Sequence, residues 1–327
     1  MATMRVIFLG MAGDLPARSL RAILDAPCEV VGVVCGEPRD AAQETALRRL
    51  AGKVARKLFL GECDPAAIAR TRGIDHLCVR SANTPEAVAW VKEREPDLMC
   101  ITTFPSLLGA ELLAVPTIGT INLHLALLPH YRGPDPLFWM ARAGESQGGV
   151  TIHWVDVGED TGDILLQEAF PSPDGQTTEE LLWRATAVGT RLMRRAVERI
   201  AGSRPNVPAE PQGEGHRNPR PRPEDAEIDA AWGARRTYNF VRLARKWQTP
   251  YLVVNGTRRD VDEAEWLPER RADETTVALS SNGAEVVCRD GTVRLWRRGR
   301  LTRACDLLRV LLRRSRAGGP TREGRRG

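Results

Sequence analysis

The sequence has no regular cysteine pattern and contains no long hydrophobic run, and each absence disfavours a class of protein. The seven cysteines among its 327 residues are odd in number and include no C-x-x-C pair. We therefore predict reduced thiols in a hydrophobic core rather than a disulfide framework or a zinc site. No run approaches the roughly 18 apolar residues of a membrane span. The apolar start is too short for a signal peptide, so we expect a cytoplasmic protein without a membrane span.

The first 200 residues have no excess of positive charge, although the formal net charge of the whole chain is +5 and its isoelectric point is near 9.0. Residues 1–200 carry 21 basic and 25 acidic side chains, a net charge of −4, and residues 201–300 are at +3. The last 27 residues alone contribute +6. Because a nucleic-acid-binding protein needs a basic surface where the phosphates lie, this distribution disfavours a nucleic acid as partner.

Short apolar runs alternate with helical patterns through the first 200 residues. The apolar runs predict strands at residues 4–10, 29–35, 76–80, 97–103, 119–125, 149–156 and 164–170. Most are apolar throughout, as strands covered on both faces must be. Helical patterns occupy 15–26, 40–58, 85–95 and 175–202, the last beginning at a capping box formed by Thr177 and Glu180. The alternation predicts an α/β domain with a Rossmann-like, doubly wound and mostly parallel sheet.

A change in composition divides the chain. Residues 203–223 hold six of the 22 prolines, which predicts an extended linker between a first domain at 1–202 and a second at 224–327. The second begins with a predicted helix over 224–247, followed by short strands with hairpin turns at Asn255-Gly256 and Asp290-Gly291. This pattern predicts a small OB-like β-barrel, with an amphipathic helix over 301–319 and a basic tail after it.

Three polar side chains are candidates for chemistry. Asn122 and His124 are two residues apart in a predicted strand, so both project to one face. Asp160 lies in the segment D-V-G-E-D-T-G-D, where two glycines allow a sharp turn after a strand. A carboxamide, an imidazole and a carboxylate together suit proton transfer with stabilisation of a developing oxyanion. A polar pair in a strand is more often structural than catalytic, so these residues alone leave both interpretations open.

The order of these motifs resembles that of the formyltransferases that use 10-formyltetrahydrofolate. That family has Asn-x-His, then Ser-Leu-Leu-Pro, then a glycine-rich Asp-Thr-Gly-Asp loop. This chain has N-L-H at 122–124, A-L-L-P at 126–129 and D-T-G-D at 160–163. The resemblance covers most of the chain and extends to the larger two-domain members. Ala126 stands where the family has serine, which would preserve a backbone contact to the folate but not a hydroxyl contact.

The resemblance implies a site and a co-substrate. His124 would help to deprotonate an amine that attacks the formyl carbon, Asn122 would stabilise the oxyanion, and Asp160 would orient His124 or take the proton through water. The co-substrate would be 10-formyltetrahydrofolate, and no metal would be needed. Its pocket would be lined by Phe104, Pro105, Leu107, Leu108, Ala126, Leu127, Leu128, Pro129 and Asp156. Loops beyond the carboxyl ends of parallel strands are where open α/β sheets bind ligands.

The acceptor is left open by the sequence. We favour a small-molecule amine, above all a nucleotide-linked amino sugar. The alternatives are methionyl-tRNA and, from another class of function, a formyl-folate hydrolase or an inactive folate-binding protein. We expect tRNA to be a disfavoured partner because residues 1–200 are net negative and residues 36–57 do not resemble the lysine-rich insertion of tRNA-binding members. The oligomeric state is also open, a homodimer being one candidate.

Two further polar residues receive simpler interpretations. His153 alternates with apolar neighbours in its predicted strand, which favours a structural role. Arg132 follows the A-L-L-P segment, where it would either meet an anionic part of a substrate or lie in a solvated turn.

Overall fold

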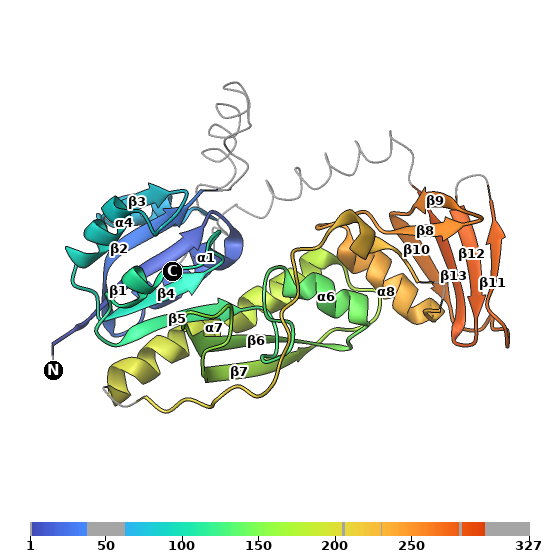
Figure 1. Cartoon of the computed structure of the whole chain (residues 1–327). Helices are drawn as coiled ribbons and strands as arrows, with labels where there is room; N and C mark the ends of the chain where they lie inside the picture. The colour runs from blue at the N-terminus through green and yellow to red at the C-terminus, as the bar shows by residue number, and fades with distance from the viewer. Residues whose placement is uncertain (1, 38–62, 205–206, 230, 281–282, 298–327) are drawn as a thin grey trace, which may run out of the picture. The chain divides into compact units, whose positions relative to one another are not determined.

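The computed structural model describes residues 2–37, 63–204, 207–229, 231–280 and 283–297. The chain divides into two compact units, Met1–Pro221 and Arg222–Gly327. Figure 1 shows a sheet with helices packed around it in the first unit and antiparallel sheets with one helix in the second.

A seven-stranded sheet forms the centre of the first unit (Figure 1). Its strands are β1 (Met4–Met11), β2 (Cys28–Gly36), β3 (His76–Val79), β4 (Leu98–Thr102), β5 (Gly119–His124), β6 (Gln147–Trp154) and β7 (Ile164–Pro171). They lie in the order β3-β2-β1-β4-β5-β6-β7. Neighbours from β3 to β5 are parallel, whereas β5–β6 and β6–β7 are antiparallel. The seven predicted strands and the mostly parallel, doubly wound sheet are confirmed.

The described helices of the first unit surround this sheet. They are α1 (Asp14–Leu24), α3 (Pro65–Thr71), α4 (Pro85–Lys92), α5 (Ala110–Leu113), α6 (Pro136–Ala143) and α7 (Thr178–Ser203). The helices predicted at 15–26, 85–95 and 175–202 are confirmed, and the one predicted at 40–58 lies outside the described residues. The capping box at the start of α7 is present: Thr177 Oγ1 accepts a bond from Glu180 N, and the Glu180 carboxylate accepts one from Thr177 N. The apolar stripe of α7 packs against α1 and β6.

Two glycines let neighbouring elements approach the end of β5 closely. A Cβ on Gly189 of α7 would lie 3.0 Å from Cδ1 of Leu123, and a Cβ on Gly149 of β6 would lie 2.3 Å from Cγ of Leu127. The two leucine side chains therefore fill the space that a larger residue would need. This packing helps to fix the position of the A-L-L-P segment that follows β5.

Residues 207–221, which make up most of the predicted linker, belong to the first unit. Glu210 exchanges both backbone hydrogen bonds with Ile164, at 2.7 and 2.8 Å, and Asn218 N donates to the carbonyl oxygen of Arg132 at 2.8 Å. The boundary between the two compact units falls after this segment. We call residues 207–221 the proline-rich segment; its backbone is bonded to the first unit, so it is not a free spacer.

The second unit, predicted to be a small OB-like β-barrel, contains antiparallel sheets among its described residues; its antiparallel β character is confirmed, and closure into a barrel stays a prediction. Its elements are η3 (Pro223–Ala226), α8 (Ala234–Ala244), β8 (Tyr251–Val254), β9 (Thr257–Asp260), β10 (Glu263–Leu267), β11 (Thr276–Leu279), β12 (Gly283–Cys288) and β13 (Gly291–Trp296). β8 and β9 form a two-stranded sheet, and the others form a four-stranded sheet in the order β10-β13-β12-β11. The hairpin turn at Asn255-Gly256 is confirmed. The hairpin predicted at Asp290-Gly291 is also present, but its two turn residues are Arg289 and Asp290, because Gly291 pairs with Cys288 as the first residue of β13. Asn255 and Gly256 both have positive φ, 49° and 71°, as a two-residue type I′ turn requires.

The helix predicted over 224–247 is much shorter in the structure. A single 3-10 turn, η3, comes first, and α8 begins only after Gly233. The carboxylate of Asp290 accepts hydrogen bonds from the amides of Ala234 and Arg235 at 2.8 and 3.0 Å. A cap from a distant hairpin is invisible to local sequence patterns, which explains the difference. The amphipathic helix predicted at 301–319 lies outside the described residues.

Two findings concern the expectations from composition. The six cysteines in the described part of the chain are free thiols, and Cys35, Cys100 and Cys288 are buried. Among the described residues, no helix combines the length and the apolar character that crossing a membrane requires.

We predict that Thr177→Ala lowers the free energy of unfolding by about 1 kcal/mol, because the helix loses the side-chain acceptor for an amide of its first turn. Urea unfolding of the full chain measures this change. Ser203→Ala is the matched control, since it removes an exposed hydroxyl at the other end of α7. Equal losses in the two variants would show that the capping box is not the source of the stability.

Candidate active site

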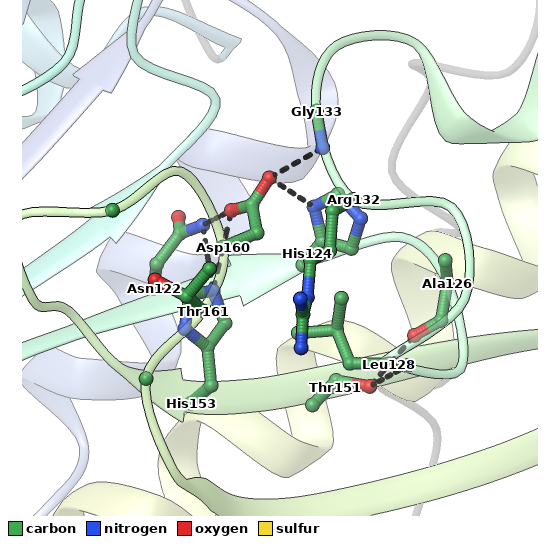
Figure 2. A network of polar contacts seen from close by, with 12 residues as sticks. Asn122, His124, Ala126, Leu128, Arg132, Gly133, Thr151, His153, Asp160 and Thr161 are labelled. Carbon is green, nitrogen blue, oxygen red and sulfur yellow. Dashed lines mark hydrogen bonds and ion pairs between the residues drawn. The ribbon is translucent and has the colours of Figure 1, made fainter. Parts of the chain in front are cut away.

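The three candidate residues lie together at the carboxyl end of β5 (Figure 2). Asn122 and His124 project from one face of that strand, and Asp160 reaches them from the loop between β6 and β7. His153 lies directly opposite Asn122 in the antiparallel register of β5 and β6, so it projects to the same face. The cluster therefore contains four polar side chains from two strands and one loop.

The carboxylate of Asp160 is at the centre of this cluster. Its Oδ2 accepts a hydrogen bond from Gly133 N at 2.9 Å and lies 3.5 Å from His124 Nδ1. Its Oδ1 accepts one from Asn122 Nδ2 at 3.2 Å and lies 3.4 Å from His153 Nε2. The φ of Asp160 is +56°, an uncommon value for a residue other than glycine, so the surroundings must hold its backbone in place.

Backbone carbonyls identify the protonated nitrogen of each neutral histidine ring. Because a carbonyl oxygen can only accept, His124 donates Nε2–H to Tyr131 O at 2.9 Å, and His153 donates Nδ1–H to Trp154 O at 2.7 Å. The remaining nitrogens, His124 Nδ1 and His153 Nε2, then carry lone pairs and face Asp160. Asn122 Nδ2 donates to His153 Nε2 at 3.2 Å. The cluster thus places a basic imidazole nitrogen beside a carboxylate.

Burial and neighbouring charges have opposing effects on the pKa values of His124 and Asp160. Burial lowers the pKa of His124, and although the Asp160 carboxylate raises it, the net pKa is below the ordinary value. Burial alone would raise the pKa of Asp160, but in the acidic range where this carboxyl titrates, the charge of protonated His124, the hydrogen bond and charge of protonated His153 and the Gly133 amide hold its pKa well below the usual range. A neutral His124 therefore faces an ionised Asp160 at neutral pH.

His153 is the residue that sequence analysis placed incorrectly outside the site. Its side chain is buried, as expected of a structural residue, yet its Nε2 lies within 3.4 Å of both Asp160 Oδ1 and Asn122 Nδ2. The signal that could have found it is strand pairing. Once β6 is taken as the antiparallel neighbour of β5, His153 falls opposite Asn122.

The first predicted pocket loop follows β4, at the same sheet edge as the cluster. Its predicted residues Phe104, Pro105 and Leu108 are half-buried, whereas Leu107 is 58% exposed. Asn83 holds the loop by donating from Nδ2 to the carbonyl oxygen of Leu107 at 2.9 Å. The hydroxyl of Ser106 is buried and has no hydrogen-bond partner among the described residues. An exposed apolar side chain beside an unsatisfied hydroxyl fits a ligand with both apolar and polar edges.

The second predicted pocket loop is the A-L-L-P segment. The side chains of Ala126 and Leu128 are buried, so they face the protein interior, and only Leu127 and Pro129 are partly exposed. Thr151 ties the segment to β6 (Figure 2), since its hydroxyl donates to Ala126 O at 2.7 Å and accepts from Leu128 N at 3.2 Å. The side chains of Ala126 and Leu128 thus help to shape the loop, and a folate contact by their backbone stays a prediction.

Asp156 also shapes a loop in this structure. Its Oδ1 accepts hydrogen bonds from Gly158 N at 2.9 Å and from Thr161 Oγ1 at 2.6 Å. These bonds brace the turn that leads to Asp160, so a folate contact by Asp156 stays a prediction. Within the described residues, no group of three or more histidine, cysteine or carboxylate side chains could hold a metal ion.

Comparisons with known proteins show similarity to formyltransferases. A family model described as formyl transferase matches residues 4–197. The methionyl-tRNA formyltransferase of Symbiobacterium thermophilum is 32% identical over 256 residues, which are 78% of this chain and 73% of that protein. The methionyl-tRNA formyltransferase of Citrifermentans bemidjiense is 29% identical over 297 residues, covering 90% of this chain and 88% of that protein.

Solved structures show the same fold across nearly the whole chain. An N-formyltransferase from Helicobacter canadensis, in complex with folinic acid and dTDP-3-aminofucose, has a TM-score of 0.60 and 16% identity over 90% of this chain and 99% of that one. HypX from Aquifex aeolicus, in complex with tetrahydrofolic acid, has a TM-score of 0.55 and 19% identity over 90% of this chain and 44% of that one. At these identities the likeness concerns the fold alone.

The expectation that tRNA is a disfavoured partner is wrong. Relatives that align with about nine tenths of this chain are methionyl-tRNA formyltransferases, and 297 aligned residues exceed the length of the first unit. The expectation failed because the net charge of 200 residues does not show where the charges lie, and phosphate binding needs only a local basic surface.

We predict that the stability of the folded chain falls as the pH drops from 7.5 to 5.5, and that His124→Gln reduces this dependence. The pKa of His124 is lower in the folded state than its ordinary value. Below about pH 6.5 the unfolded chain therefore binds a proton that the folded chain does not, which favours unfolding. Urea unfolding at several pH values measures the effect, with the exposed His216→Gln as control. An unchanged pH dependence in His124→Gln would show that His124 is not buried in its neutral form.

Proposed function

The chain belongs to the formyl transferase family, and from that membership we propose that it transfers the formyl group of 10-formyltetrahydrofolate to the amino group of methionyl-tRNA. The observation that supports this acceptor is the alignment with methionyl-tRNA formyltransferases over 90% of this chain and 88% of a relative. The folate co-substrate is supported by the family match and by neighbours solved with folates. A cytoplasmic location and activity without a metal stay predictions from the sequence.

His124 is the group we assign to remove a proton from the acceptor amine. Its Nε2–H is bonded to Tyr131 O, so Nδ1 is the nitrogen left to act as a base. An amine that attacks the formyl carbon becomes positively charged unless it loses a proton as the new C–N bond forms. A neutral imidazole accepts that proton near neutral pH, which is the role of a general base.

Asp160 stabilises the charge that this transfer creates. Its ionised carboxylate lies 3.5 Å from His124 Nδ1 and only 13% of its side chain is exposed. In such a poorly solvated site the attraction between a carboxylate and an imidazolium is stronger than in water. The proton held by His124 is then available to the folate nitrogen that is released when its bond to the formyl carbon breaks, so that charge and atoms balance.

Asn122 has no spare N–H group for a substrate oxyanion in this structure. Both of its N–H groups are used inside the cluster, one on Asp160 Oδ1 and one on His153 Nε2, each at 3.2 Å. We therefore infer that one of these hydrogens changes partner when the substrates bind and donates to the negative charge that develops on the formyl oxygen. The bond to His153 is the one to give up, because the bond to Asp160 keeps the carboxylate in place.

Two other acceptors compete with methionyl-tRNA. A nucleotide-linked amino sugar, the acceptor that we favour from the sequence, is supported here only by the fold of the sugar-modifying neighbours. Water is the acceptor in a formyl-folate hydrolase, and the same base could activate it.

We predict that His124→Gln lowers kcat by about 100-fold or more, because the general base is lost. Asn122→Ala should lower kcat by a similar factor of about 10² to 10³ through the lost donor. Initial rates of folate-dependent formyl transfer measure both, and His216→Gln serves as the exposed control. Near-normal rates in both site variants, with normal folding, would remove these residues from the mechanism.

We predict that the chain formylates methionyl-tRNA with 10-formyltetrahydrofolate at a higher kcat/KM than any amino sugar. The kcat/KM should fall as the salt concentration rises, because contacts with phosphates release counterions. The assay compares initiator methionyl-tRNA, nucleotide-linked 3- and 4-amino sugars, and buffer without an amine. A faster reaction with a sugar would establish that acceptor instead, and folate deformylation at the same rate without any amine would indicate a hydrolase.

A further inference from the structure

Gln212, in the proline-rich segment, is bonded to the backbone of the loop that carries Asp160. Its Nε2 donates to the carbonyl oxygens of Asp160 and Gly162, at 3.0 and 2.6 Å. These two carbonyls lie on either side of the peptide group that joins Thr161 to Gly162, so one amide group fixes the orientation of two peptide planes of the loop. Asp160 has a positive φ of 56°, and its backbone is therefore the part of this loop that most needs external support.

The other end of the Gln212 side chain is bonded to the turn that follows the A-L-L-P segment. Its Oε1 accepts hydrogen bonds from Arg132 Nε and Nη2 at 3.1 and 2.9 Å. A guanidinium group presents these two donors in a fixed plane, which makes such a bond strong and directional. Arg132 Nη2 also donates to Gly213 O at 3.1 Å. Arg132 thus binds the proline-rich segment. The sequence had suggested instead that it meets an anionic part of a substrate or lies in a solvated turn.

These bonds connect the two segments that hold His124 and Asp160. The turn at 131–133 supplies Tyr131 O to His124 and Gly133 N to the Asp160 carboxylate. Arg132, between them, holds Gln212, and Gln212 holds the backbone of Asp160. The two segments that fix the relative position of His124 and Asp160 are therefore joined a second time through Gln212.

We propose, on the basis of the function proposed above, that Gln212 is a positioning residue that holds Asp160 against His124, so that the proline-rich segment takes part in building the active site. The side chain touches the loop backbone and Arg132 and does not touch the reacting groups of the cluster. Its effect on the reaction passes through Asp160.

Loss of this support should act on the basicity of His124. His124 is faced by Asp160 and Glu159 from the β6–β7 loop and by His153 from β6. Glu159 is itself paired with Arg217 of the proline-rich segment. A substitution of Gln212 removes neither partner of that ion pair. When the Asp160 carboxylate moves away, the interaction that raises the pKa of His124 weakens, and the pKa falls.

The test variant is Gln212→Met, which keeps the length of the side chain and removes all of its hydrogen bonds without adding charge. We expect kcat for formyl transfer to fall about 10- to 100-fold, since small displacements of a catalytic group have effects of this size. The KM for the folate should stay within about twofold, and the acid limb of the pH profile of kcat/KM should move to lower pH. Gln147→Met is the matched control, because it makes the same chemical change at an exposed position of the first unit.

A second measurement separates this inference from the proposed function. An NMR titration of the His124 imidazole needs no substrate, and we expect a lower pKa in Gln212→Met than in the unchanged chain and in Gln147→Met. If the unchanged chain is active and Gln212→Met has the same kcat, pH profile and His124 pKa, the positioning role is wrong while the proposed function stands. If the unchanged chain does not formylate methionyl-tRNA, the titration alone decides, and an unchanged pKa overturns the inference.

If Gln212→Met does not fold, Gln212→Glu provides the test instead. That variant keeps an acceptor for Arg132 but presents a carboxylate to the carbonyl oxygens of Asp160 and Gly162, so kcat should again fall by about tenfold or more. A normal kcat in a folded Gln212→Glu would overturn the inference.

Discussion

The buried carboxylate of Asp160 is the group on which the arrangement of the first unit's site depends. A charge with 13% of its side chain exposed is stable only when polar groups replace the water it has lost. The donors come from two parts of the chain: β5 supplies the amide of Asn122, and the turn after β5 supplies the backbone amide of Gly133. His124 of β5 and His153 of β6 complete the surroundings of the carboxylate. The buried carboxylate therefore depends on β5, β6 and the turn after β5 being in place together, and this arrangement also puts His124 beside it.

The proline-rich segment shows how the site is connected to the rest of the chain. Its composition is that of a spacer, yet its backbone pairs with Ile164 and with Arg132, and its Gln212 side chain joins two segments of the site. Proline suits this role, because it fixes φ and favours an extended path that can run along a surface.

Much of the first unit could be predicted from the sequence, because its strands are continuous apolar runs and its motifs keep their order. The grouping of Asn122, His124 and Asp160 was predicted by the same means. Contacts between distant residues could not be predicted. His153 joins the site through strand pairing, Ala126 and Leu128 turn inward because Thr151 bonds their backbone, and Asp290 caps a helix from a hairpin. The exclusion of tRNA failed for a related reason, since a sum of charges contains no positions.

The central claim is that His124 is a neutral base whose Nε2 carries the proton and whose Nδ1 faces an ionised Asp160. Nitrogen-15 NMR of the chain labelled in its five histidines measures this directly, with the His124 signals assigned by their loss in His124→Gln. At pH 7.5 the account predicts a protonated Nε2 and an unprotonated Nδ1 in that ring. A protonated Nδ1, whether in a neutral or a charged imidazole, would contradict the account, because the nitrogen beside Asp160 could not then take a proton from the amine.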